Sequence, residues 1–168
     1  HTLIAVEKEG RLINMDSQAP NRVAAEALES GALRLTAAPP TLIRREMAYH
    51  ESRFDLYLEA PGEKLYAEVK GVTLEENGVV RFPDAPTLRG LKHIRELERA
   101  AKEGYGAAVL FVVQMEEAEF FCPNDATQPE FGAALRSAQA AGVQLLARCC
   151  HVTPLEITLG EEIPIRLK

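Results

Sequence analysis

Two runs of alternating apolar and polar residues flank a Pro-Gly pair near the middle of the chain. Residues 52–59 and 64–70 each alternate with a period of two, which is typical of strands with one buried face. Pro61-Gly62 marks a turn between them, so the pattern predicts a β-hairpin in which facing residue numbers sum to a constant. The predicted apolar face pairs Phe54 with Val69, Leu56 with Ala67, and Leu58 with Leu65. The predicted polar face pairs Tyr57 with Tyr66, Glu59 with Lys64, and Asp55 with Glu68.

The patterning elsewhere predicts further strands and three helices. Strands are expected at residues 2–6, 11–15 and 42–49, and at 79–82 after an Asn77-Gly78 hairpin turn. Helices are expected at 21–30, from Asp84 or Thr87 to about Glu103, and at 131–141. The strand that contains Lys70 is expected to continue to Leu74. Apolar runs at 107–113 and 143–152 indicate strands covered on both faces, and 155–167 reads as short strands broken by Gly160 and Pro164.

This order of elements predicts an α/β (mixed) fold. A mixed β-sheet, antiparallel in its front half and parallel in its back half, would be flanked by helices. A length of 168 residues is most simply one domain.

The predicted hairpin brings chemistry to one place. Asp55 would face Glu68 with the Cβ atoms roughly 5 Å apart, and Lys70 would point to the same side. Like charges in facing positions are destabilising, so either a cation neutralises the pair or the two carboxylates share a proton. Two carboxylates beside a lysine suit Mg²⁺, which keeps several waters and phosphate oxygens. The alternative is an exposed strand face whose charges are solvated.

Composition limits the class of protein and the cellular compartment that we expect. The net charge of −6 argues against a generic nucleic-acid coat protein. No apolar run approaches membrane-spanning length, and the first residues lack the pattern of a signal peptide. The missing apolar run predicts no membrane partner. The three cysteines form an odd set with no zinc-like spacing, which favours a reducing cytoplasm.

Charge is distributed unevenly along the chain. Residues 81–102 hold six Lys or Arg against three Asp or Glu, together with His93. A basic strip beside a carboxylate cluster suits an enzyme that holds a phosphodiester backbone and a metal together. The alternative is a solvated helix face with ordinary ion pairs.

Several short motifs are spread over essentially the whole chain. They are Pro20-Asn21-Arg22, Ser52-Arg53-Phe54-Asp55, Glu68-Val69-Lys70-Gly71-Val72-Thr73-Leu74, Phe82-Pro83-Asp84-Ala85-Pro86-Thr87-x-Arg89-Gly90-x-Lys92-His93 and the run from Ala107 to Gln114. Together these motifs resemble the sugar fermentation stimulation protein A family. The resemblance implies a restriction-endonuclease-like domain with an Asp…Glu-x-Lys signature, DNA as partner, and a role in regulating sugar, notably maltose, metabolism. Family members usually begin with a small oligonucleotide-binding barrel, so residues 1–16 are expected to be remnant strands from its end, followed by one nuclease-like domain.

The resemblance also implies roles for individual residues. Asp55 and Glu68 would be ligands of Mg²⁺ or Mn²⁺, with the Val69 carbonyl and Glu26 of the first helix as further ligands. Lys70 would position or activate water, and Gln114 would orient Lys70 or a phosphate. The residues expected to grip the nucleic-acid backbone are Arg89, Lys92 and His93.

Three hypotheses follow. The first is a metal-dependent phosphodiesterase in which water attacks in line. The second is a DNA-binding regulator that retains a nuclease scaffold with little or no turnover. The third is a structural or small-molecule-binding module in which Asp55 and Glu68 share a proton.

Overall fold

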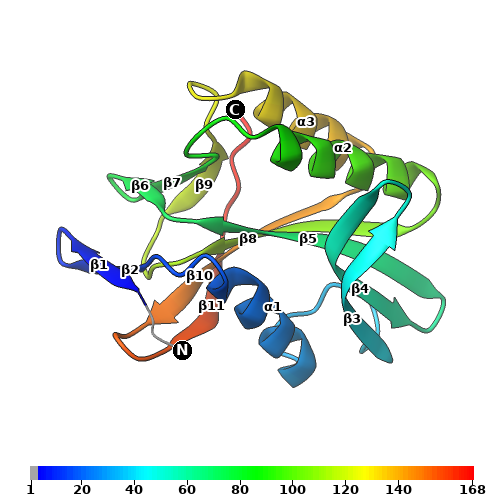
Figure 1. Ribbon diagram of the computed structural model, residues 1–168, viewed down its shortest axis with the longest axis horizontal. Coiled ribbons are helices and arrows are strands. Elements are labelled where there is room, and N and C mark those ends of the chain that lie inside the picture. Colours follow the sequence, from blue (N-terminus) through cyan, green and yellow to red (C-terminus); the bar gives the residue numbers. More distant parts are fainter. Residues whose placement is uncertain (1–3) are drawn as a thin grey trace.

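A six-stranded mixed sheet runs through the centre of the molecule, with helices on both faces (Figure 1). The computed structural model describes residues 4–168. The strand order in the sheet is β11 (Ile157–Ile163), β10 (Gln144–Val152), β8 (Gly106–Val113), β5 (Glu63–Val72), β4 (Ser52–Ala60) and β3 (Leu42–Tyr49). Strands β3, β4 and β5 are antiparallel, whereas β5, β8 and β10 are parallel. The predicted mixed sheet is therefore confirmed, with β11 added antiparallel to β10 at the far edge.

Within the described residues, three helices cover this sheet and divide the core in two. Helix α1 (Ala19–Ser30) lies on one face, whereas α2 (Leu88–Lys102) and α3 (Pro129–Ala140) lie on the other (Figure 1). One apolar cluster joins α2 and α3 to the sheet, and a second joins α1 to the opposite face. Thr87, not Asp84, caps α2, because its hydroxyl accepts the Gly90 N–H at 2.9 Å.

Two smaller sheets lie at one end of the large one. The first pairs β1 (Ala5–Lys8) with β2 (Arg11–Asn14), and the second has the order β6 (Leu74–Glu76), β7 (Val79–Phe82), β9 (Phe120–Pro123). The predicted strand at 2–6 begins outside the described residues. That β1 and β2 are the remnant of a barrel stays a prediction.

Two strand predictions need correction, and one strand was not predicted. Strand β5 ends at Val72, and Leu74 opens β6 in a different sheet. Strand β9 was not predicted, because four residues that contain Cys and Pro carry little periodicity. Strand β11 runs unbroken through Gly160, because a bulge places Gly160 and Glu161 of β11 opposite the single residue Cys149 of β10 and accommodates the close approach of the two backbones.

The β4–β5 hairpin has the predicted register from Leu56–Ala67 to Ala60–Glu63, around a turn at Pro61-Gly62. The predicted partner of Phe54 is wrong. Leu56 and Leu58 pack on the α1 side of the sheet, but Phe54 packs on the α2 side. Strict alternation would have kept all three on one face.

The cause is a switch of faces that β3 and β4 make together. Their pairing keeps one register from Leu42–Glu59 to Tyr49–Ser52, except that Glu46 and Asp55 do not pair. Glu46 has a left-handed backbone with φ of 55°. In β3, Ile43 packs on the α1 side of the sheet and Met47 on the α2 side. Strand β4 behaves in the same way, since Leu56 packs on the α1 side and Phe54 on the α2 side. We call this the face switch; it turns Asp55 out of the regular ladder.

No helix in residues 4–168 combines the length and the apolar character needed to cross a membrane.

Candidate functional site

The site lies where β4 parts from β5. Pairing between these strands ends at Leu56 and Ala67, so the next residues of β5 keep β8 as their only strand neighbour. The face switch turns Asp55 toward this gap. The gap is bordered by α1 on one side of the sheet and by α2 on the other.

Asp55 fills the gap with its carboxylate. Its Oδ2 accepts the backbone N–H of Val69 at 2.8 Å, and its Oδ1 accepts the side-chain amide N–H of Asn21 in α1 at 3.2 Å. The backbone N–H of Asp55 in turn donates to Glu68 Oε1 at 3.2 Å. These reciprocal bonds replace the ladder bonds that the two strands lose, and they bring the two carboxylates into contact.

Glu68 is buried in a cluster with two basic side chains. Its Oε2 lies 3.0 Å from Lys70 Nζ and 2.5 Å from His93 Nδ1, and Lys70 Nζ lies 3.2 Å from the same His93 nitrogen. Glu68 is 2% exposed, and His93 is buried on the side of α2 that faces the sheet. A carboxylate this deep is tolerated because it is paired and hydrogen-bonded.

The two carboxylates titrate in opposite directions. Burial, followed by the charge of Glu68, raises the pKa of Asp55 from 3.8 to about 6. Burial would also raise the pKa of Glu68, but the His93 hydrogen bond and the Lys70 charge outweigh it and lower that pKa to about 2. Such a separation within one carboxylate pair is typical of functional sites.

The structure places the other expected residues as follows. Val69 contributes a backbone N–H to Asp55; a role for its carbonyl stays a prediction. Glu26 is exposed on α1, and this helix reaches the cluster through Asn21 instead. Within residues 4–168, no group of three or more His, Cys, Asp and Glu side chains is arranged to hold a metal ion. The structure therefore does not bring Glu26 together with Asp55 and Glu68.

Gln114 is buried directly after β8, but its contacts differ from those expected. Its amide nitrogen donates to the carbonyls of Asn14 and Asp16, each at 3.0 Å. Its Oε1 lies against Gly71, where a Cβ would come within 2.5 Å of it. Gln114 thus fixes the connection that leads into α1 and the strand end after Lys70, rather than bonding to Lys70 itself.

The basic residues of α2 separate into two groups. Arg89 and Lys92 are exposed and free to contact a ligand, whereas His93 faces inward onto Glu68 and Lys70. The expectation that His93 grips a nucleic-acid backbone is therefore not supported by its position. Helical spacing could have shown that His93 faces inward, because it lies three residues after Gly90 and four before Leu97, and both of these are buried. Asn21 belongs to the Pro20-Asn21-Arg22 motif, but its hydrogen bond to Asp55 could not be predicted from the sequence and is seen only in the fold.

The donors present suit a divalent cation. Both Asp55 oxygens and Glu68 Oε1 each accept one protein hydrogen bond and keep a lone pair for a cation, whereas Glu68 Oε2 is already bonded to Lys70 and His93. A cation near Asp55 would favour the ionised form of the group whose pKa the protein raises. Two carboxylates with the remaining positions filled by water match the preference of Mg²⁺.

Comparison with known proteins identifies the chain at this point. The model of the family described as "Sugar fermentation stimulation protein RE domain" matches residues 18–156. The chain belongs to the sugar fermentation stimulation protein family. A homologue from Desulfitobacterium hafniense strain Y51 is 48% identical over 167 residues, covering 99% of this chain and 72% of the relative. One from Ruminiclostridium cellulolyticum is 47% identical over 165 residues, covering 98% and 72%.

A solved structure has the same fold. SfsA of Pyrococcus furiosus, determined in complex with Ca²⁺, superimposes with a TM-score of 0.85 at 25% identity. The match covers 96% of this chain and 70% of that chain.

Proposed function

We propose that this chain is a DNA-binding, metal-dependent phosphodiesterase domain of the Asp…Glu-x-Lys type. The observation that carries the proposal is the contact between Asp55 and Glu68, with Lys70 3.0 Å from Glu68, in the gap between β4 and β5. A relative of the same fold was determined with Ca²⁺, a cation that prefers the same oxygen ligands.

The roles follow from the contacts. Asp55 and Glu68 would hold Mg²⁺ or Mn²⁺, with the Val69 carbonyl as a further donor. When bound, such an ion acts as a Lewis acid on a phosphoryl oxygen and makes its bound water more acidic. Asn21 and the Val69 N–H hold the Asp55 carboxylate in orientation. Glu68 holds the Lys70 ammonium at 3.0 Å, and the charge of that ammonium would stabilise the negative charge that develops on phosphate. His93 holds Glu68 in place by donating to the same carboxylate oxygen.

DNA is the proposed partner. Arg89 and Lys92 are exposed on the helix that carries His93, which places two cations near the carboxylate cluster. Contacts of this kind hold a phosphate backbone without reading its sequence.

The test compares the parent chain with Asp55→Ala and with Asp84→Ala, which removes an exposed aspartate as a control. Labelled single- and double-stranded DNA would be incubated with Mg²⁺, with Mn²⁺ and with a chelator. We expect metal-dependent cleavage that falls by roughly 100-fold or more in Asp55→Ala, because it loses a metal ligand. We expect Asp84→Ala to cleave like the parent. Cleavage by Asp55→Ala at the parent rate would show that the assignment is wrong.

A second candidate is a DNA-binding regulator of sugar (maltose) metabolism with little or no turnover. The observation that favours it is the saturation of Glu68: both Lys70 and His93 already neutralise its Oε2. In that case the same protein would bind DNA with a steep salt dependence that persists in Asp55→Ala, and none of the metals would produce cleavage. Absence of DNA binding at low salt would count against this candidate.

A further inference from the structure

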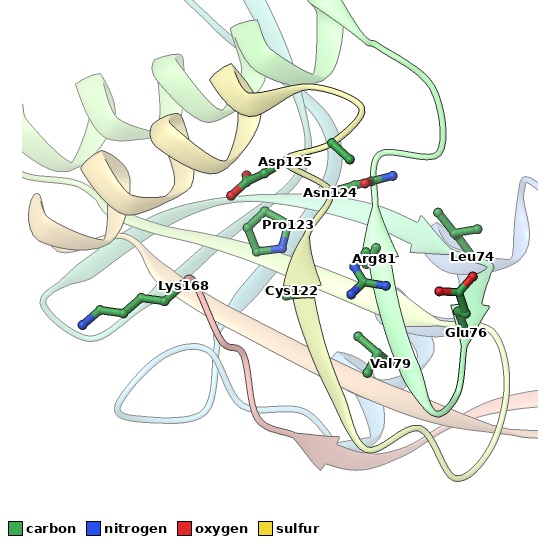
Figure 2. Close-up of a pocket in the computed structure, with 10 residues that line it drawn as sticks. Leu74, Glu76, Val79, Arg81, Cys122, Pro123, Asn124, Asp125 and Lys168 are labelled. Carbon is green, nitrogen blue, oxygen red and sulfur yellow. The ribbon is translucent and has the colours of Figure 1, made fainter.

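A cavity of about 520 Å³ lies on the small sheet formed by β6, β7 and β9 (Figure 2). Val80 and Phe121 of this sheet are buried in the core that it shares with the large sheet. The residues that alternate with them, Val79, Arg81 and Cys122, therefore face outward and line the cavity. Its volume lies within the range of about 300–1,000 Å³ that small-molecule sites occupy.

Arg81 occupies the centre of this surface. It lies on the middle strand of the sheet, where it pairs with Leu74 of β6 and with Cys122 of β9. None of the ion pairs found within residues 4–168 involves Arg81. Of the two acids in the lining, Asp125 lies 3.8 Å from Arg136, and Glu76 faces Val79 in the ladder. The half-buried Arg81 guanidinium is thus left without a carboxylate partner in the cavity.

The chemistry of the lining defines the ligand. A guanidinium presents a fork of N–H donors that matches phosphate, and it is the preferred protein group for phosphate recognition. Around it, Leu74, Val79 and Pro123 supply apolar surface, on which a flat base can lie. Asn124 adds an amide, which is itself fixed by a bond from its nitrogen to the Pro83 carbonyl at 2.9 Å. A phosphate joined to an apolar, hydrogen-bonding ring is the chemistry of a nucleotide.

We propose that the cavity on the outer face of β6, β7 and β9 is a nucleotide-binding subsite, in which Arg81 holds the phosphate. The source of the nucleotide is either a free mononucleotide or one unit of a nucleic-acid strand. The strand version rests on the proposed function, whereas the free-nucleotide version is independent of it.

The position of the cavity favours a nucleic-acid strand. Leu74 follows Lys70 by only four residues, a separation of at most about 13 Å in extended chain. That length corresponds to about four nucleotide steps at 3.4 Å each. The wall of the cavity formed by residues 124–126 is joined to the start of α2. The joining contacts come from the nearby Gln128 side chain, which accepts the Thr87 N–H and donates to the Thr87 carbonyl. A strand lying across the carboxylate cluster could therefore reach Arg81.

The experiment measures binding without turnover. Arg81→Gln removes the charge, and Leu74→Glu places a carboxylate directly opposite Arg81 on the sheet surface. Lys102→Gln removes an exposed cation nine residues beyond His93 as a charge-matched control. Each variant would be titrated in chelator with a labelled 16-nucleotide single strand, by fluorescence anisotropy at several salt concentrations, and with AMP, by calorimetry. Circular dichroism would verify that each variant is folded.

We expect Arg81→Gln and Leu74→Glu to weaken binding about tenfold, and Lys102→Gln to change it less than twofold. For the 16-mer, the dependence of log K on log salt should fall by about 0.7 in Arg81→Gln, as expected for one lost phosphate contact. A loss confined to the 16-mer assigns the cavity to a strand, and a loss for AMP assigns it to a free nucleotide.

Unchanged binding of both probes in Arg81→Gln, or no binding of either probe by the parent, would overturn the proposal. An Arg81 effect on binding without any Asp55-dependent cleavage would remove the proposed phosphodiesterase and leave the subsite standing.

Discussion

Asp55 and Glu68 come from the facing strands of one hairpin, yet their surroundings make them different acids. Glu68 has two basic partners, whereas Asp55 has an amide, a backbone N–H and a neighbouring negative charge. The structure therefore assigns the permanent charge to Glu68 and leaves Asp55 as the group that a bound cation would ionise. Alternation and the turn predicted that both carboxylates and Lys70 lie near one another, and the hairpin register is as predicted from Leu56–Ala67 to Ala60–Glu63. Asp55 itself lies outside that ladder and reaches Glu68 through the face switch.

The raised pKa of Asp55 predicts an unusual dependence of stability on pH. An unfolded aspartate titrates near 3.8, and the native one near 6, so the native state binds more protons between these values. Stability contributed by this group is complete below about pH 4 and is lost as pH rises through 6. We expect Asp55→Asn, in chelator, to remove this loss, with a difference from the parent on the order of 1–2 kcal/mol between pH 4 and 7. Urea unfolding at pH 4, 5, 6 and 7 measures it.

Glu68 is expected to change stability with pH in the opposite direction to Asp55. Its lowered pKa contributes stability that is complete above about pH 4.5 and is lost only as pH falls toward 2. The effect of Asp55→Asn should therefore be read above about pH 4.5, where the contribution of Glu68 to stability is complete and Asp55 still loses its proton. A parent and a variant with parallel pH profiles across that range would contradict the raised pKa of Asp55.

The β3–β4 pair shows where reasoning from sequence succeeds and where it stops. Turn chemistry located Pro61-Gly62 and Asn77-Gly78, and capping chemistry limited the start of α2 to Asp84 or Thr87, because each is a local signal. The face switch has no local signal, since Glu46 carries no tendency toward a left-handed backbone. It arises because the strand must turn Asp55 out of the ladder, which is a tertiary requirement. Phe54 was misplaced because of this face switch, whereas the inward position of His93 follows from its helical spacing to the buried Gly90 and Leu97.

Glu46 offers a test at the level of the strand. A left-handed conformation is costly for a residue with a Cβ and is free of that cost for glycine. We expect Glu46→Gly to raise the free energy of unfolding by about 0.5–1 kcal/mol, since the relief of strain exceeds the added entropy of the unfolded chain. Urea unfolding measures the change. Glu51→Gly, at an exposed position of the same hairpin without positive φ, should not stabilise; equal effects of both variants would show that Glu46 is not strained.

At the scale of the whole molecule, the small sheet and the large sheet share one core. Phe121 of β9 stacks on Phe111 of β8 with ring centroids 4.1 Å apart, and Val80 of β7 lies in the same cluster. The cavity around Arg81 and the carboxylate cluster therefore lie on one packed body. Neither the short strand β9 nor this stacking could be predicted, because both depend on a crossover that brings residues 79–82 beside 120–123.

Shared packing predicts cooperative unfolding. Truncating Phe121 to Ala in this core should cost about 3–5 kcal/mol. All four tyrosines, Tyr49, Tyr57, Tyr66 and Tyr105, pack together around β3, β4 and β5, so their fluorescence reports on the part of the fold that holds the hairpin. We expect the tyrosine transition and the far-ultraviolet circular dichroism transition in urea to shift together in Phe121→Ala. A tyrosine transition that stayed at the parent midpoint would show that the sheets unfold separately.

The face switch also constrains how this gene can change length. In both strands the side chains change sides of the sheet at the same position, where Glu46 stands opposite Asp55. Inserting or deleting one residue between Glu46 and Asp55 would bring these two positions out of register with each other. The side chains beyond it would then point to opposite sides of the sheet from their partners. Among relatives, length variation should therefore accumulate elsewhere, for example in the loop between α1 and β3, while the spacing from Glu46 to Asp55 stays fixed at nine residues.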